Sequence, residues 1–206
     1  MRKLQALAAL AGIVLTGCAG FGIVATSDPL AKLRDAEDLY ARQYRPLPAE
    51  RLIREAMAIY EERDDPHGLG HAHRNYGDFL GSAAVLKWEA LYRRDGFLDK
   101  TISFDNRKTK ALEHYSKALE YYRRAEKQHQ QAQKYDALTN VYYSMAWSHF
   151  MLDENDKACF YYDQALGAYH ENIRRNPNAK PFVPSGYRSI SDLIESAKRR
   201  TGCQSA

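Results

Sequence analysis

The stretch from Tyr135 to His170 constrains the fold most, because its periodicity is that of two amphipathic helices joined by a short polar turn. Asp, Glu, Asn and Asp at 153–156 form the turn. A small residue stands at Ala146 in the first helix and at Ala158 in the second, each flanked by large side chains one helical turn away. This spacing lets two antiparallel helices approach closely. The stretch therefore predicts a helical hairpin.

Earlier parts of the chain repeat this signature. Residues 73–80, HRNYGDFL, follow the pattern of the first helix, and residues 111–118, ALEHYSKA, follow that of the second. Together with the hairpin they resemble the tetratricopeptide repeat (TPR), whose motif W-x2-L-G-x2-Y…A-x3-F pairs two antiparallel helices. The resemblance covers residues 29–200 in outline. It implies an all-α, TPR-like solenoid of about three antiparallel helix pairs with a C-terminal capping helix, which such a stack needs to cover its end.

Proline and glycine divide the rest of the chain into helices. Besides the hairpin, we expect helices over about 29–43, 49–63, 66–94, 107–131 and 187–200, with a loop over 97–106. Relative to the TPR spacing, residues near 84–106 form an insertion. The insertion is too apolar to be fully exposed to solvent, so it either packs on the other helices or forms part of a binding surface.

The N-terminus predicts export and lipid attachment. A short positive head precedes the apolar run 4–15, which is too short to span a bilayer and fits a secretory signal. The run ends in Leu-Thr-Gly-Cys at 15–18, which resembles the bacterial lipobox. The alternative is an ordinary signal followed by a chance cysteine. The resemblance implies that Cys18 carries diacylglycerol and a further acyl chain such as palmitate.

These features divide the chain into a signal peptide (1–17), the lipidated Cys18 with a tether (18–28), the helical domain (29–203) and a tail (204–206). Stable anchoring takes more than one acyl chain, which a lipoprotein supplies. Because Ala19 follows the cysteine where an aspartate would favour the inner membrane, we expect the outer membrane, with the domain facing the periplasm.

The charge balance argues against nucleic-acid binding. The chain has 30 Lys and Arg against 26 Asp and Glu, and loss of Arg2 and Lys3 with the signal leaves 28 (30 − 2) basic side chains. A nearly balanced chain has no field that gathers a polyanion. We expect no nucleic-acid partner.

Two cysteines remain in the predicted mature domain, Cys159 and Cys203. In an oxidising periplasm a disulfide between them is favoured over two free thiols. The alternative is one buried cysteine on a helix and one exposed cysteine in the tail. We predict the bridge, because a capping helix along the last repeat would bring Cys203 back to Cys159.

Signs of catalysis and of metal binding are weak. Three histidines cluster at His67, His71 and His73. His67 and His71 are one helical turn apart, but no Cys or carboxylate lies at a convincing spacing for a third ligand, so surface or partly packed histidines are the expectation. Glu126-x-x-His129 has no second copy to complete a di-metal site. The turn 153–156 lacks the glycine and the terminal glutamate of a calcium loop. With no hydrolase or phosphate-binding signature, we expect no enzyme, cofactor, metal or small-molecule substrate.

By resemblance to TPR proteins, the first helix of each repeat lines a concave groove that accepts an extended protein segment. The implied groove residues are His71, Arg74 and Asp78 from the second repeat and Asn140, Tyr143, Trp147 and Phe150 from the third. They would form a polar wall beside an aromatic wall, with Trp147 as the anchor. The alternative is that Trp147 and Phe150 are ordinary packing residues.

The combined expectation is a lipid-anchored, periplasm-facing protein that works by binding another protein. An adaptor or assembly factor of an envelope complex is the first interpretation. The alternative is an immunity lipoprotein that neutralises a periplasm-acting toxin.

Overall fold

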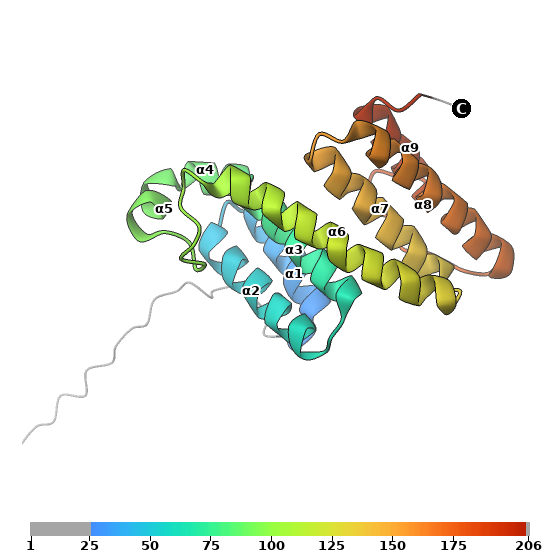
Figure 1. Ribbon diagram of the computed structural model, residues 1–206, viewed down its shortest axis with the longest axis horizontal. Helices are drawn as coiled ribbons and strands as arrows, with labels where there is room; N and C mark the ends of the chain where they lie inside the picture. The colour runs from blue at the N-terminus through green and yellow to red at the C-terminus, as the bar shows by residue number, and fades with distance from the viewer. Residues whose placement is uncertain (1–25, 205–206) are drawn as a thin grey trace, which may run out of the picture.

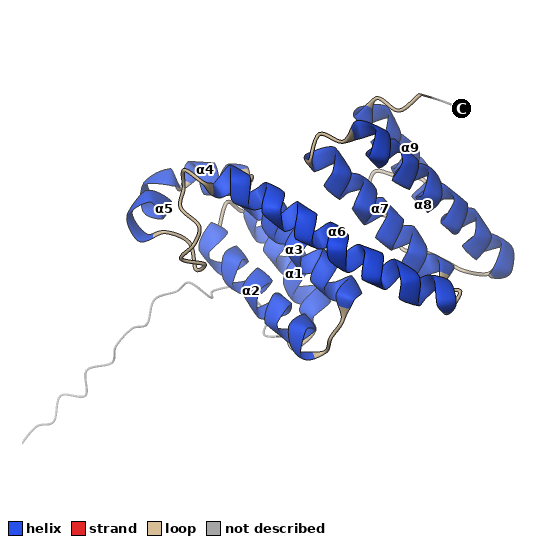
Figure 2. Cartoon of the chain, in the orientation of Figure 1, coloured by secondary structure: helices blue, strands red, loops and turns tan. Residues whose placement is uncertain are grey.

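The computed structural model describes residues 26–204, and this part of the chain is all-α (Figures 1 and 2). The helices are α1 (Pro29–Ala41), α2 (Pro46–Glu62), α3 (Pro66–Leu80), α4 (Ala83–Lys87), α5 (Glu89–Asp95), α6 (Arg107–Gln131), α7 (Tyr135–Met151), α8 (Asn155–Arg175) and α9 (Ile190–Thr201). The predicted all-α class is confirmed for this part of the chain. The predicted signal peptide and Cys18 lie outside the described residues.

Each long helix packs in antiparallel fashion against a long helix that comes next to it in the chain, with the short α4 and α5 lying between α3 and α6. The main pairs are α1 with α2, α3 with α6, and α7 with α8, and α9 packs on α8. In addition α3 contacts both α1 and α7, so these three helices lie in succession on one side of the molecule. The long helix α6 runs across the view of Figure 1 and joins the α1–α5 region to the α7–α9 region.

Local sequence explains where most helices begin. Asp28 caps α1 by accepting a hydrogen bond from the Leu30 N–H, with Pro29 in the first helical position. The second helix begins at Pro46, three residues before the predicted start at 49. Pro46 and Pro48 both fit there, because the first turn of a helix has no intrahelical partner for their missing N–H groups.

The predicted third helix, from 66 to 94, is wrong in its C-terminal half. The helix α3 ends at Leu80, and α4 and α5 follow as two separate short helices divided at Trp88. The Ser82 hydroxyl accepts a hydrogen bond from the Val85 N–H and so starts α4. Gly81 and Ser82 thus supply a weak helix former followed by a preferred N-cap, which together outweigh the helical periodicity beyond them.

The insertion packs on the helices over most of its length. Its buried apolar residues are Ala84, Val85, Tyr92, Phe97, Ile102 and Phe104, whereas Leu86, Trp88 and Leu98 are exposed. The Glu50 carboxylate of α2 accepts hydrogen bonds from the Leu98 N–H at 2.7 Å and from the Tyr76 hydroxyl at 2.9 Å. Burial raises the pKa of Glu50. This buried carboxylate ties the loop 97–106 to α2 and α3.

The apolar core has two parts that meet along α6. Residues up to Tyr115 pack with α1–α5, and residues from Ala118 onward pack with α7–α9. The helices α3 and α6 approach closely at glycines: a Cβ added at Gly70 would lie 2.5 Å from the Tyr122 ring, and one at Gly77 would lie 2.9 Å from the Tyr115 ring. The small residue of the motif is therefore needed for α3–α6 packing.

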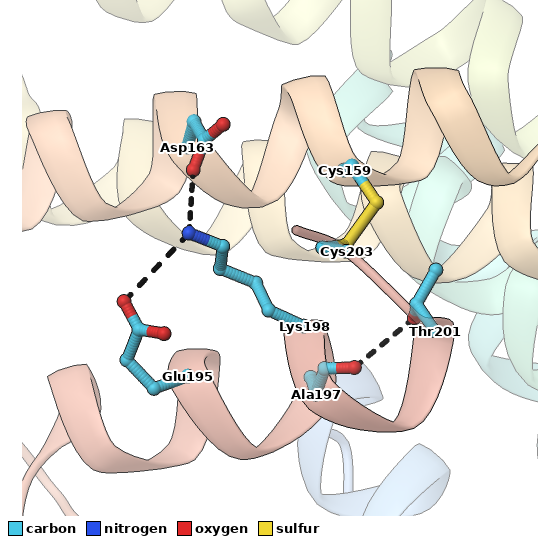
Figure 3. The surroundings of a disulfide bond; sticks show 7 residues. All are labelled: Cys159, Asp163, Glu195, Ala197, Lys198, Thr201 and Cys203. Carbon is cyan, nitrogen blue, oxygen red and sulfur yellow. Dashed lines mark hydrogen bonds and ion pairs between the residues drawn. A yellow bond between two sulfur atoms is a disulfide. The ribbon is translucent and has the colours of Figure 1, made fainter. Parts of the chain in front are cut away.

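The last helix, α9, is fastened to α8 by covalent and ionic contacts (Figure 3). The expected disulfide between Cys159 and Cys203 is present, with the two Cα atoms 5.5 Å apart. Lys198 Nζ lies 2.8 Å from Asp163 Oδ1. The helix begins at Ile190, three residues later than predicted, because the Ser189 hydroxyl caps it by accepting from the Asp192 N–H.

Candidate functional site

A cavity of about 390 Å³ lies where the C-terminal ends of α1, α3 and α7 meet. We call it the α1–α3–α7 cavity. It is lined by Glu37, Tyr40, Ala41, Asp78, Gly81, Ser82, Ala83, Tyr115, Trp147 and Met151. Two of the predicted groove residues, Asp78 and Trp147, therefore line one cavity although they are 69 positions apart in the sequence.

The Asp78 carboxylate connects the walls of this cavity. Its Oδ1 accepts hydrogen bonds from Trp147 Nε1 at 3.1 Å and from the Tyr115 hydroxyl at 2.7 Å. Burial raises the pKa of Asp78, and this effect outweighs the lowering by the Arg74 charge and by the two hydrogen bonds. The carboxylate holds the indole of α7 and the phenol of α6 in fixed positions.

Arg74 lies one helical turn before Asp78 on α3 and has no direct counter-ion. No carboxylate of the described residues is within 4.0 Å of its guanidinium, and its buried Nε has no hydrogen-bond partner there. Burial disfavours its charged form, but the Tyr122 phenol and the carboxylates of Asp78 and Glu37 outweigh burial and raise its pKa. Arg74 is therefore a charged group whose burial without a direct ion pair lowers the stability of the fold.

His71 differs from its predicted role as a groove residue open to a partner. Its Nδ1 lies 3.1 Å from the Tyr122 hydroxyl, and its Nε2 lies 3.0 Å from His67 Nε2. His67 Nδ1 in turn lies 3.2 Å from His129 Nε2. We call these four side chains the histidine chain. Both ring nitrogens of His71 are engaged with protein groups, so this side chain joins α3 to α6.

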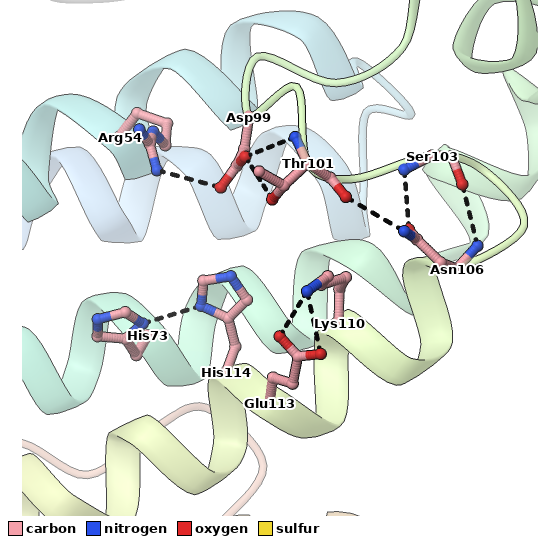
Figure 4. A network of polar contacts seen from close by, with 9 residues as sticks. All are labelled: Arg54, His73, Asp99, Thr101, Ser103, Asn106, Lys110, Glu113 and His114. Atoms are coloured by element: carbon pink, nitrogen blue, oxygen red, sulfur yellow. Dashed lines mark hydrogen bonds and ion pairs between the residues drawn. The ribbon is translucent and has the colours of Figure 1, made fainter.

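A second histidine pair joins the same two helices (Figure 4). The Nδ1 atoms of His73 and His114 are 2.8 Å apart, and both rings are buried. Burial, followed by the interaction with His114 and with Lys117, lowers the pKa of His73 to about 3. Burial, followed by the charge of Lys117, lowers the pKa of His114 to about 4. Sequence reasoning noticed His73 but missed His114, because only the α3–α6 register brings the two together.

The predicted aromatic wall on α7 is only partly open. Asn140 is exposed, and Tyr143, Trp147 and Phe150 are half-buried. The Tyr143 ring packs against Tyr162 of α8 at a centroid distance of 5.7 Å, and Trp147 lies 5.7 Å from Phe150. Of these four residues, only Trp147 lines the α1–α3–α7 cavity.

Among the cavity-lining residues that the sequence did not predict are the titratable side chains Glu37, Tyr40 and Tyr115. Glu37 and Tyr40 belong to the first helix pair, where the signature is degenerate. Tyr115 lies in the motif stretch 111–118, where the repeat pattern predicts a packing role. Spacing from Leu33 along α1 could have placed Glu37 one turn and Tyr40 two turns further along the same helix.

No metal site is evident in the described part of the chain, where no group of three His, Cys, Asp or Glu side chains could hold an ion. Glu126 of the Glu-x-x-His motif instead accepts a hydrogen bond from Tyr142 at 3.2 Å. No helix within residues 26–204 is long and apolar enough to cross a membrane. Comparison with family models, with curated proteins and with solved structures finds no match.

Proposed function

We propose that this chain is a lipid-anchored adaptor or assembly factor of the bacterial envelope that binds a protein partner in the α1–α3–α7 cavity. The observation that carries the proposal is Trp147, a half-buried tryptophan that lines an open cavity and is oriented by its hydrogen bond to Asp78. Tryptophan and tyrosine dominate binding energy at protein interfaces when they lie at the centre of the contact. A pre-oriented ring also loses little conformational entropy on binding.

The helix arrangement supports a TPR-like solenoid. The pairs α1–α2, α3–α6 and α7–α8 would be three repeats, and α9 would be the cap. The first helices of the three pairs, α1, α3 and α7, contact one another in succession, as groove-lining helices of TPR proteins do. The cavity lies between these helices, which is where the resemblance places a groove for an extended segment.

The proposed location rests on the lipobox-like 15–18 and on the cysteines. Cys18 would carry the lipid and hold the helical domain close to the membrane. The Cys159–Cys203 disulfide fits an oxidising compartment such as the periplasm.

The test is affinity capture from native membranes with in vivo crosslinking, comparing Trp147→Ala with Trp88→Ala. Trp88 is the only other tryptophan, and it lies in the exposed part of the insertion with its Nε1 donating to the Tyr44 carbonyl. Loss of a central interface tryptophan costs about 2 kcal/mol or more, which is about thirtyfold in affinity. We expect Trp147→Ala to abolish recovery of the partner and Trp88→Ala to leave it unchanged.

Two results would contradict this function. In the first, a folded Trp147→Ala variant, with a melting temperature near that of the wild type, recovers the partner in full. In the second, Trp147→Ala unfolds whereas Trp88→Ala does not, which would make Trp147 a packing residue.

A further inference from the structure

The charged and titratable groups that line the α1–α3–α7 cavity have one sign. Glu37 of α1 and Asp78 of α3 supply carboxylates, and Tyr40 and Tyr115 supply phenols, whereas no Lys, Arg or His is among the lining residues. Both hydrogen bonds that Asp78 receives go to Oδ1. Its Oδ2 accepts none from the described residues, so one carboxylate oxygen is left for a ligand.

The ends of three helices add to this negative character. The helix α1 ends at Ala41 and α7 at Met151, and both residues line the cavity together with Gly81, the C-cap of α3. The last carbonyl groups of a helix have no intrahelical partner and carry partial negative charge. Three such ends around one cavity favour a cation.

The Asp78 charge also acts on the two tyrosines that line the cavity. Burial raises the pKa of Tyr40 and of Tyr115, and the charge of Asp78 raises both further. Arg74 opposes this at both phenols but does not reverse it, and its guanidinium makes no direct ion pair with Asp78. At both phenols the charge of Asp78 therefore outweighs that of Arg74, the buried arginine one turn away.

The cavity also presents aromatic rings to an occupant. Tyr40, Tyr115 and Trp147 come from three different helices and line it together. The faces of such rings attract ammonium and guanidinium groups, and their hydrocarbon surface accommodates the stem of a long side chain. Carboxylates combined with rings are a suitable environment for a cation, and a poor one for an anion.

We propose that the α1–α3–α7 cavity receives a lysine or arginine side chain of the protein partner. The cationic head pairs with Asp78 Oδ2, Glu37 supplies a second charge from the α1 wall, and the stem lies against Trp147. This inference rests on the proposed function, because it specifies which chemistry of the partner the same cavity recognises.

The test follows the two tryptophan indole N–H signals by ¹H–¹⁵N NMR on the mature domain. The probes are Nα-acetyl-lysine amide and Nα-acetyl-arginine amide, and the controls are the uncharged Nα-acetyl-norleucine amide and the acidic Nα-acetyl-glutamate amide. Because Trp147 donates to Asp78, a cation at that carboxylate should shift the Trp147 signal and leave the Trp88 signal in place. The stronger of the two cationic probes identifies the preferred side chain.

Asp78→Asn keeps the shape of the site and removes its charge. Because charge-assisted hydrogen bonds are about twice as strong as neutral ones, we expect it to weaken the cationic probes about tenfold or more. Glu62→Gln is the matched control, since it removes one negative charge at the exposed end of α2. If Asp78→Asn fails to fold, Glu37→Gln takes its place, with a smaller loss of about threefold.

Norleucine amide binding as well as lysine amide, or glutamate amide shifting Trp147 more than either cation, would overturn the inference. So would cationic affinities that are equal in wild type and in Asp78→Asn. Each of these results leaves the proposed function standing if Trp147→Ala still abolishes capture of the partner. Loss of both would reject the cavity as a binding site.

Discussion

The polar side chains on the two faces of α3 differ in whether they have hydrogen-bond partners within the chain. Toward α6, His71 and His73 have ring nitrogens paired with groups of the same chain, and glycines bring the helices close. On the face that carries Asp78, the buried Nε of Arg74 has no hydrogen-bond partner among residues 26–204, and only one oxygen of the Asp78 carboxylate accepts hydrogen bonds from them. Buried polar groups are normally satisfied, so the first face serves the fold and the second is available for binding.

The largest expected effect is a loss of folding stability at low pH, caused by the histidines on the face of α3 toward α6. Burial lowers the pKa of His67 to about 4, and it also lowers those of His71, His73, His114 and His129. The unfolded chain binds protons near pH 6.5 and the folded chain does not. Stability is therefore complete above pH 6.5 and is lost as pH falls toward 4, by about 4 kcal/mol or more. Urea unfolding at several pH values measures this loss.

A substitution isolates the histidine contribution to that loss. His114→Asn can still hydrogen-bond to His73 but cannot ionise, so the loss between pH 6.5 and 4 should become smaller. The groups facing this pair are Arg54, Lys117, Asp99 and Glu113, which remain unchanged. Buried carboxyls with raised pKa values act in the opposite direction, so a stability that is constant down to pH 4 would show that they, and not the histidines, dominate.

The second effect concerns the contact between α8 and α9, which is held covalently. Cys203→Ser opens a loop with a sequence separation of 44 and should lower the free energy of unfolding by about 2–4 kcal/mol. The α1–α3–α7 cavity includes no residue of α9, so the Trp147 indole signal should not move. A shifted signal would show that the cap and the cavity are coupled.

The third effect compares two glycines. Gly70→Ala places a Cβ 2.5 Å from the Tyr122 ring and should destabilise the α3–α6 contact by about 2 kcal/mol. Gly167→Ala meets nothing within 4 Å in the middle of α8 and should stabilise the chain by about 0.5–1 kcal/mol. Thermal melts of both variants check the signs. Equal effects would mean that α3 and α6 are less tightly packed than the structure has them.

The smallest effect on stability is expected at Arg74. Arg74→Met removes a guanidinium whose buried Nε has no partner, and it also removes the charge that favours the Asp78 carboxylate. These changes oppose each other, so the free energy of unfolding should change by less than about 1 kcal/mol. Capture of the partner should nevertheless change, because Asp78 then titrates at higher pH. A large loss of stability would place Arg74 among the residues that serve the fold.

Local signals predicted the helices well. The bounds of α6 agree with the prediction at both ends, and α1 begins at the predicted proline, because caps, prolines and periodicity act within a few residues. The third helix failed where two local signals conflicted, and the Gly81–Ser82 signal prevailed. The disulfide could be predicted because the expected oxidising compartment and the expected capping helix both favour it.

The site could be predicted only in part. The repeat resemblance named Trp147 and Asp78 but not the hydrogen bond between them, which depends on how α3 and α7 are aligned. Glu37 was missed because the first repeat departs from the motif. The pairing of His73 with His114 depends on contacts across 41 positions of sequence, which no periodicity within one helix contains.

The histidine chain has a consequence for where its protons can lie. If Tyr122 donates to His71 Nδ1, then His71 must donate through Nε2 to His67, and His67 must donate through Nδ1 to His129. Reversal of one link requires reversal of the next, so the rings have two collective tautomeric states and few mixed ones. Protonation of His129 therefore changes the hydrogen bonding of Tyr122, which lies two turns away on α6. We expect the titrations of the three imidazoles to be coupled.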